Sequence, residues 1–283
     1  MANVVINDIH LTDIAAAIRE KNGSADTYKP SEMAAAIAAI TTTPGGSDTG
    51  ETDFEAYIGR QLSGEVELTC ERVGNYGLAG FWNVTKFTVH GNVSGSNAFL
   101  GCNKLQEINI TENTTIGSNS CYGLTKLATV NAPLATEIGD YAFYNCSALT
   151  NATFGDVSRV GEYAFGYCSK LTKVDLGTCN QVDNYVGYIG PVLKGAAFSS
   201  KSLNAIIIRS TYMPWCIDSY TPFPDQFKAN YAGALEKGYI YVPAAMIEQY
   251  ESYTGNISSS APQYDHLSML SYRAIEDYPD ICG

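Results

Sequence analysis

The chain has 283 residues, with 17 basic and 29 acidic side chains and a formal net charge of −12. This charge argues against nucleic acid and anionic membranes as partners, because both attract basic surfaces. Hydrophobic residues make up 45% of the sequence, which indicates a folded chain, and no apolar run is long enough to cross a bilayer. Residues 1–10 lack the cationic start and apolar core of a secretory signal, so we expect none.

Residues 1–40 carry the apolar spacing of two short helices, separated by Gly23. Two alanine-rich helices of this length bury too little surface to be stable alone. We therefore predict a helical hairpin that docks on copies of itself, on another protein or on the rest of the chain, followed by a flexible linker at 41–53. The residues on its apolar faces are Leu11, Ile14, Ile18, Met33, Ile37 and Ile40.

The dominant feature of the sequence is an internal repeat. Its glycines recur in steps of 21, 22, 22 and 22 residues, and each is followed by a small residue three positions later and by apolar residues 4, 7, 10, 13 and 15 positions later. A period of this length indicates one supersecondary unit per repeat, stacked into a solenoid. The repeat glycines are Gly74, Gly95, Gly117, Gly139 and Gly161.

Each repeat predicts two local structures. Its end alternates between apolar and polar residues, which is typical of a strand, so successive repeats should form a parallel sheet on one face. Its G-x-x-A-F-x-x-C part has helical spacing and predicts a helical turn on the opposite face. We predict the solenoid over 54–210 and a C-terminal cap over 211–283, with a last strand at 238–242 and a capping helix at 244–250.

The residues that could carry chemistry are scattered. The eight cysteines form no C-x-x-C pair and the three histidines lie far apart, so we predict no metal site. Cysteine at the seventh position of the repeat alternates with Phe81 and Leu124, which predicts buried free thiols. No nucleophile elbow, phosphate loop or metalloprotease motif occurs, so we predict no enzyme and no cofactor.

Binding remains as the function. The residues between the apolar strand positions should face outward, and amides and hydroxyls suit hydrogen bonds to sugars, although an ordinary solvated sheet would look the same. Tyrosines recur near the repeat glycines and either offer contact area or pack along the stack. An aromatic loop around Trp215 either covers the cap or forms a recognition tip. The candidate binding residues are Glu107, Asn109, Thr129, Asn131, Asn151, Thr153, Lys173, Asp175, Tyr141, Tyr144, Tyr163 and Trp215.

Three segments resemble known families. IGDYAFYNCSALTNATFG and VGEYAFGYCSKLTKVDLG resemble the BspA-type leucine-rich repeat, and the resemblance covers about 73–176. LTDIAAAIREKNGSADTYKPSEMAAAIAAI resembles a module at the front of phage tail proteins. IIIRSTYMPWC and KGYIYVPAAMIEQY resemble the cap of phage-associated members of the repeat family. The resemblance implies an α+β fold, with a leucine-rich-repeat solenoid and a small N-terminal helical hairpin.

The same resemblance implies a role on a phage particle. The chain would be a virion protein of the tail tip, baseplate or tail fibre, attached to other virion proteins through the hairpin and present as a homo-oligomer. Its solenoid would bind a host cell-surface glycan or protein. Two alternatives stay open: a purely structural decoration of the head or tail, and an adhesin on a bacterial cell surface.

Overall fold

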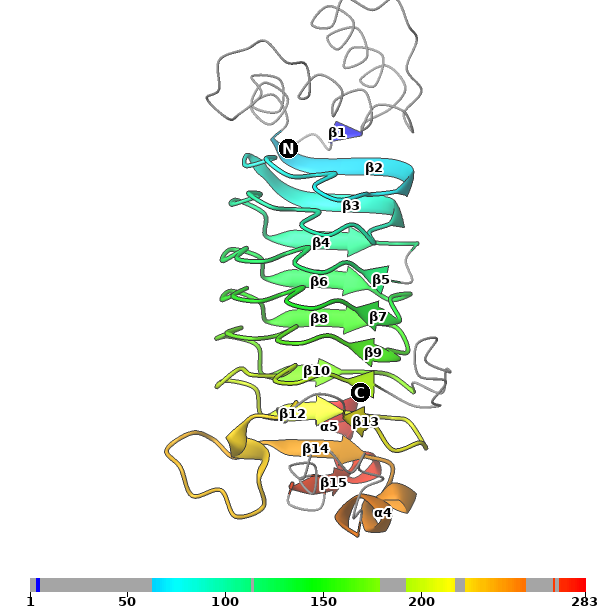
Figure 1. Ribbon diagram of the computed structural model, residues 1–283, viewed down its shortest axis with the longest axis vertical. Helices are drawn as coiled ribbons and strands as arrows, with labels where there is room; N and C mark the ends of the chain where they lie inside the picture. Colours follow the sequence, from blue (N-terminus) through cyan, green and yellow to red (C-terminus); the bar gives the residue numbers. More distant parts are fainter. Residues whose placement is uncertain are drawn as a thin grey trace, which may run out of the picture.

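The computed structural model describes residues 4–5, 63–112, 115–178, 192–216, 222–252, 267 and 270–283, with only the backbone of Val4, Val5, Glu71 and Trp215. The repeats stack into an elongated solenoid, which Figure 1 shows as a column of strands across the long axis. The predicted hairpin at 1–40 lies outside the described residues except for a two-residue strand, and the linker at 41–53 lies outside them entirely. The hairpin prediction includes Leu11, Ile14, Ile18, Met33, Ile37 and Ile40, none of which is described.

The predicted parallel sheet is present along the solenoid. Its first part has the order β1-β2-β3-β4-β6-β8 and its second part has the order β10-β12-β14-β15, which continues the column in Figure 1. Equivalent positions of successive repeats lie opposite each other in the sheet. Glu107 lies opposite Thr129, and Thr129 lies opposite Asn151. The strands of the first part are β1 (Val4–Val5), β2 (Gly64–Arg72), β3 (Val84–Asn92), β4 (Glu107–Ile110), β6 (Thr129–Ala132) and β8 (Asn151–Phe154). Those of the second part are β10 (Lys173–Asp175), β12 (Ala205–Ile207), β14 (Tyr239–Val242) and β15 (Tyr272–Ala274).

A second line of strands, which the sequence reasoning missed, runs beside the first. Each strand has two residues and stands before a repeat turn, and the order is β13-β11-β9-β7-β5. In each of the first three strands along the chain, the first residue faces outward and the second is buried, as in Thr115 and Ile116. The strands are β5 (Thr115–Ile116), β7 (Glu137–Ile138), β9 (Arg159–Val160), β11 (Val192–Leu193) and β13 (Trp215–Cys216).

The predicted helical turn in each repeat is wrong. The segment instead makes tight turns through left-handed residues, which lie four positions apart within most repeats. This reversal of the chain points alternate amides along the solenoid axis, so the Tyr141 N–H donates to the Glu162 carbonyl at 2.8 Å and the Phe143 N–H to the Ala164 carbonyl at 2.8 Å. The left-handed residues in these turns are Tyr76, Gly80, Asn97, Gly101, Asn119, Gly123, Tyr141, Asn145, Tyr163, Tyr167 and Ala196.

The repeat glycines are explained by the close approach of successive repeats. A Cβ on Gly95 would lie 2.0 Å from the Gly74 carbonyl oxygen, and one on Gly117 would lie 2.2 Å from the Gly95 oxygen. A Cβ on Gly161 would lie 2.4 Å from the Asp140 nitrogen. These contacts involve backbone that cannot move independently, so a side chain at Gly95, Gly117 or Gly161 would force two repeats apart.

Aromatic rings and thiols fill the interior of the solenoid. Phe143 stacks on Phe165 at 5.5 Å between ring centroids, Phe165 on Phe198 at 5.9 Å, and Phe198 on Phe223 at 5.9 Å. These four rings belong to successive levels and are buried. The interior is therefore continuous from the repeats into the C-terminal region, although Phe165 and Phe198 lie 33 positions apart in the sequence instead of 22.

The predicted buried free thiols are confirmed for the described cysteines. All seven are free, and Cys102, Cys121, Cys146 and Cys168 are buried. Cys102 and Cys168 each donate an S–H bond of 3.0 Å to a carbonyl of the preceding repeat, which a purely apolar residue could not do. Burial raises the pKa of both thiols to about 12, so neither provides a thiolate nucleophile at neutral pH.

The cap holds all the helix that the structure describes, so the α+β expectation is wrong for the repeats. The predicted strand at 238–242 and helix at 244–250 are confirmed, but β15 lies beyond β14, so β14 is not the last strand. No helix in this described part is long and apolar enough to cross a membrane. The helices are η1 (Asp225–Phe227), η2 (Ala244–Met246), α4 (Ile247–Glu251), η4 (Ile275–Asp277) and α5 (Pro279–Cys282).

Candidate functional site

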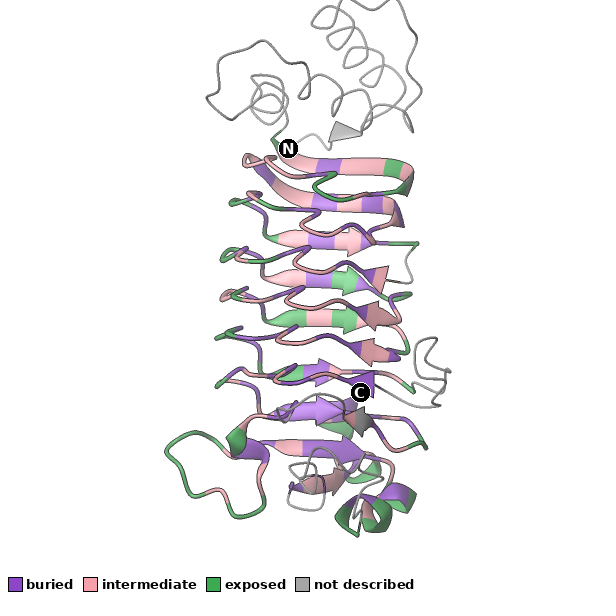
Figure 2. Cartoon of the chain, in the orientation of Figure 1, coloured by how far each residue is buried: buried purple, intermediate pink, exposed green. Residues whose placement is uncertain are grey.

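The polar residues predicted on the sheet face lie together on β4, β6 and β8. Asn131, Asn151 and Thr153 are exposed, as Figure 2 shows by the green segments of β6 and β8. Within the described part of the chain, no side-chain hydrogen bond involves Thr129, Asn131 or Thr153. This part of the sheet is therefore an open polar surface without a preformed network.

Further toward the N-terminal end, the same face is occupied by internal contacts. The Lys86 ammonium lies 3.0 Å from a carboxylate oxygen of Glu107, and the Asn109 amide donates to that oxygen at 2.8 Å. The hydrogen bond from Lys86, and then the one from Asn109, lower the pKa of Glu107. Glu107 and Asn109 were predicted as ligand contacts, but the structure pairs them with each other.

Lys173 and Asp175 were predicted as ligand contacts on the sheet face, where Lys173 is exposed and Asp175 is half-buried, and both make internal contacts. The Lys173 ammonium donates to the Ile281 carbonyl at 2.8 Å, and Asp175 pairs with the Arg209 guanidinium at 2.7 Å. The C-terminal helix α5 covers this end of the sheet, because the outward residues of the neighbouring strands are apolar: Ile207 is fully buried there in one cluster with Cys282. Lys173 therefore anchors the C-terminal segment directly, and Asp175 does so through Arg209, which also donates to the Cys282 carbonyl.

The structure brings the recurring tyrosines into one contiguous array on the turn side of the repeats. The rings of Tyr122 and Tyr144 stack at 5.2 Å, those of Tyr141 and Tyr163 at 5.4 Å, and Tyr144 contacts Tyr141 at 5.5 Å. Tyr167, which the sequence reasoning missed, meets Tyr144 edge to face at 5.2 Å. We call these five residues the tyrosine cluster.

The tyrosine cluster is both supported and accessible. Tyr122 is 42% exposed and Tyr167 is 61% exposed, whereas Tyr141, Tyr144 and Tyr163 are half-buried beneath them. Burial, and then the negative charge of Glu162, raise the pKa of Tyr141. Tyr141 therefore offers a neutral ring and hydroxyl group at neutral pH.

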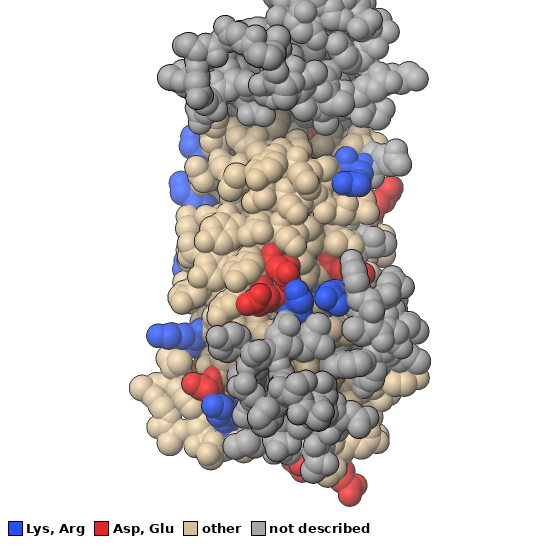
Figure 3. All heavy atoms as spheres, viewed as in Figure 1, with Lys and Arg blue, Asp and Glu red and all other residues tan. Residues whose placement is uncertain are grey.

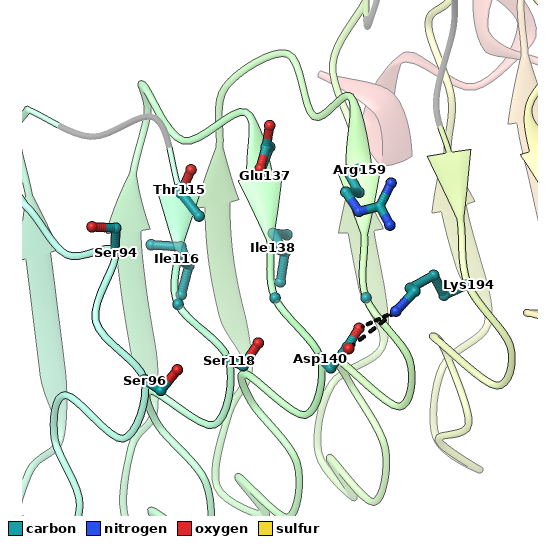
Figure 4. A pocket seen from close by; sticks show the side chains of 13 residues that line it. Ser94, Ser96, Thr115, Ile116, Ser118, Glu137, Ile138, Asp140, Arg159 and Lys194 are labelled. Carbon is teal, nitrogen blue, oxygen red and sulfur yellow. Dashed lines mark hydrogen bonds and ion pairs between the residues drawn. The ribbon is translucent and has the colours of Figure 1, made fainter. Parts of the chain in front are cut away.

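A polar groove of about 320 Å3 runs beside these turns, over β5, β7 and β9 (Figure 4). Its floor includes the repeat glycines Gly117, Gly139 and Gly161. The residues that line it and that carry polar side chains are Ser94, Ser96, Thr115, Ser118, Glu137, Asp140, Arg159 and Lys194.

The groove is rich in hydroxyls at one end and charged at the other. Lys194 follows β11 at the position that glycine holds in the preceding repeats, and its ammonium reaches back to Asp140 at 2.9 Å (Figure 4). Asp140 also accepts the Glu162 N–H at 2.9 Å. Since Tyr141 follows Asp140 directly, the groove and the tyrosine cluster share a boundary. Figure 3 shows a compact mixed group of charged side chains near the middle of the face in view, and further charged side chains toward its edges.

The sequence held a signal for the groove that was not used. The pairs Thr115-Ile116, Glu137-Ile138 and Arg159-Val160 each precede a repeat glycine with the same polar–apolar order, at the repeat period. Trp215 begins β13, but its side chain lies outside the described part. Among the described residues, no group of three His, Cys, Asp or Glu side chains could hold a metal ion.

Comparison with solved structures gives a leucine-rich repeat protein from Bacteroides ovatus, with 18% identity and a TM-score of 0.41, over 75% of this chain and 45% of that protein. The chain thus spans less than half of that protein's length. Comparison with curated proteins gives no match. The family model for the BspA type leucine rich repeat region matches residues 65–150 and 92–213, in six copies and over more than half of the sequence. The chain therefore belongs to the BspA type leucine-rich repeat family.

Proposed function

We propose that this chain is a non-catalytic binding protein that recognises a cell-surface glycan through the tyrosine cluster and the adjoining polar groove. The observation that carries the proposal is the array of five tyrosine rings in mutual contact on an exposed surface. Aromatic faces pack against the C–H faces of sugars, and tyrosine adds a hydroxyl at low conformational cost. The groove supplies serine and threonine hydroxyls and a carboxylate for the sugar hydroxyls.

The backbone of the cluster supports a role beyond packing. Tyr141, Tyr163 and Tyr167 hold left-handed backbone at φ 56°, 49° and 59°, which costs a residue with a Cβ about 1–2 kcal/mol. Asn97 and Asn119 adopt the same conformation at the position of Tyr141 in earlier repeats, and asparagine tolerates it better. The turn therefore does not require tyrosine, and its ring accounts for its presence.

The particle that carries this binding surface is also part of the proposal. We infer a phage virion protein of the tail tip, baseplate or fibre, in which residues 1–40 attach the chain to other virion proteins; this rests on the sequence resemblance of that segment. Several copies on one particle would strengthen weak glycan binding through effective concentration. Mass spectrometry of purified particles tests this assignment, and particles without the chain would contradict it.

Binding of the fluorescent full-length chain to a panel of Gram-positive bacteria and their purified wall glycans tests the glycan proposal. We expect strain-selective binding that falls at least about ten-fold when Tyr122 and Tyr167 are both changed to alanine, since each exposed ring contributes about 1 kcal/mol. The matched control changes Tyr76 and Tyr212, which are 56% and 43% exposed and lie outside the tyrosine cluster.

The outcomes separate the proposals. Loss of binding in the control as well as in the cluster variant would contradict a specific site. Binding that survives in the cluster variant but is lost on changing Asn131 and Thr153 to alanine would move the site to the open sheet face. Absence of binding across the panel would favour a structural decoration, and detection of the chain on bacterial cells without particles would favour an adhesin.

A further inference from the structure

Basic side chains gather at a second hollow, at the C-terminal end of the sheet face. The hollow has a volume of about 520 Å3 and lies over β10, β12 and β14, beside α5. In register across these strands, Lys173 lies opposite Ala205 and Ala205 opposite Tyr239. The short alanine between two long side chains leaves the space, and Lys237 and Arg273 also line it.

Arg273 and Lys237 both face the ring of Tyr239. The Arg273 guanidinium carbon lies 3.4 Å from the centroid of that ring and 4.7 Å from the centroid of Tyr278. The Lys237 ammonium lies 5.5 Å from the Tyr239 centroid. Cation–π contacts hold these two positive groups at one aromatic wall.

The three cations lack carboxylate partners among the described residues, unlike Lys86, which pairs with Glu107. Lys173 and Lys237 each donate one bond to a backbone carbonyl, at 2.8 and 3.0 Å. An ammonium has three donors, so each keeps capacity for a ligand.

Two acidic side chains also line the hollow. One of them, Glu236, accepts a bond from the Asn204 amide at 3.2 Å. The other is Asp280 at the start of α5. Neither forms an ion pair with the three cations among the described residues. The hollow thus presents unpaired positive charge on a chain whose net charge is −12.

We propose that this hollow binds the anionic group of a sugar-sized ligand, a carboxylate or a phosphate ester. Lys173, Lys237 and Arg273 would contact the anion, and Tyr239 would wall the ring that carries it. The volume lies within the range of about 300–1,000 Å3 typical of small-molecule sites. The site is separate from the tyrosine cluster, so this inference does not rest on the proposed glycan binding.

Isothermal titration of the full-length chain with glucose 6-phosphate, glucuronate and glucose tests the inference. We expect saturable binding of at least one of the two anions, weaker binding at higher salt, and no binding of glucose. Lys237→Gln should weaken anion binding about ten-fold, the loss expected for one hydrogen bond to a charged group. Lys170→Gln, which changes an exposed lysine outside the hollow, is the matched control.

The comparison of the two anions identifies the source of the charge. Binding of only glucose 6-phosphate assigns the hollow to phosphate esters, and binding of only glucuronate assigns it to uronic acids. Arg273→Gln gives a second variant, and its thermal melting shows whether loss of the Tyr239 contact unfolds the cap. Binding of neither anion, equal binding of glucose, or undiminished binding in Lys237→Gln would overturn the inference.

Discussion

The two ends of the sheet face differ in what the same strand positions do. On β6 and β8 the outward residues Asn131 and Thr153 are polar and exposed. On β12 and β14 the equivalent outward residues Ile207 and Tyr241 are buried beneath α5. The backbone pairing is parallel in both regions, so the difference comes from the side chains alone.

The polarity of the outward residues of a solenoid strand therefore indicates whether another segment covers that face of the sheet. Polar outward side chains can remain in contact with water, whereas apolar outward side chains are stable only when another segment removes them from water. The C-terminal segment of this chain supplies that cover, and Lys173 and Asp175 at the border hold it in place.

An aspartate introduced at each end of the sheet face should give the largest difference in the free energy of unfolding. We expect Ile207→Asp to lower the free energy of unfolding by about 3–5 kcal/mol, because the carboxylate would be buried without a partner; Arg209 already pairs with Asp175. The matched change Thr153→Asp, at an exposed position, should cost less than about 0.5 kcal/mol. Urea denaturation followed by circular dichroism measures both, and equal effects would break the comparison.

Two glycines on the turn side, one crowded by neighbouring backbone and one with free space around it, should give a smaller difference in stability. We expect Gly117→Ala to cost about 2–3 kcal/mol, because its Cβ would lie 2.2 Å from the Gly95 oxygen. Gly123→Asn should cost less than about 0.5 kcal/mol, since nothing lies within 4 Å of that Cβ and Asn145 holds the equivalent left-handed position one repeat later. Thermal unfolding distinguishes the two, and a neutral Gly117→Ala would show that the repeats can move apart.

The smallest expected effect concerns the N-terminal part of the open face. Because Lys86 and Asn109 lower the pKa of Glu107, ionised Glu107 stabilises the native state at neutral pH. This contribution is lost as the pH falls from about the ordinary value of 4.5 through the lowered folded-state value. Glu107 is 38% exposed, so we expect only about 0.3 kcal/mol.

A double-mutant cycle of Lys86→Met and Glu107→Gln measures this coupling. Urea midpoints at neutral pH should give the small favourable term, and the same cycle well below pH 4.5 should give none. A coupling that persists in acid would mean that the pair acts through packing instead of charge.

The residue pattern predicted the repeated strands and thiols correctly, but it did not predict the turns or the contacts of the C-terminal segment. The apolar strand positions and the buried thiols were predicted correctly, because their surroundings repeat every 21 or 22 residues and each copy supports the others. The helical turn was predicted wrongly, since spacing of three and four residues also fits two tight turns with left-handed residues. The internal contacts of Lys173 and Asp175 were not predicted, because nothing near them in the sequence indicates α5.

In the candidate sites, too, residues that recur with the repeat could be predicted, whereas residues brought together only by folding could not. Tyr141, Tyr144 and Tyr163 were recognised from their recurrence, whereas Tyr167 was missed because only one repeat carries tyrosine there. The hollow at Tyr239 joins residues more than 60 positions apart, Lys173 and Lys237, and no local pattern brings them together.

The repeat length, the inward strand residues, the free thiols and the family could all be predicted from the amino-acid sequence, because each depends on local residue type repeated at a fixed period. Which tyrosines touch, where the polar groove lies and which end of the sheet α5 covers became visible only in the folded molecule. The physical reason is that stacking converts residues one repeat apart into neighbours, while a cover from the far end of the chain obeys no period.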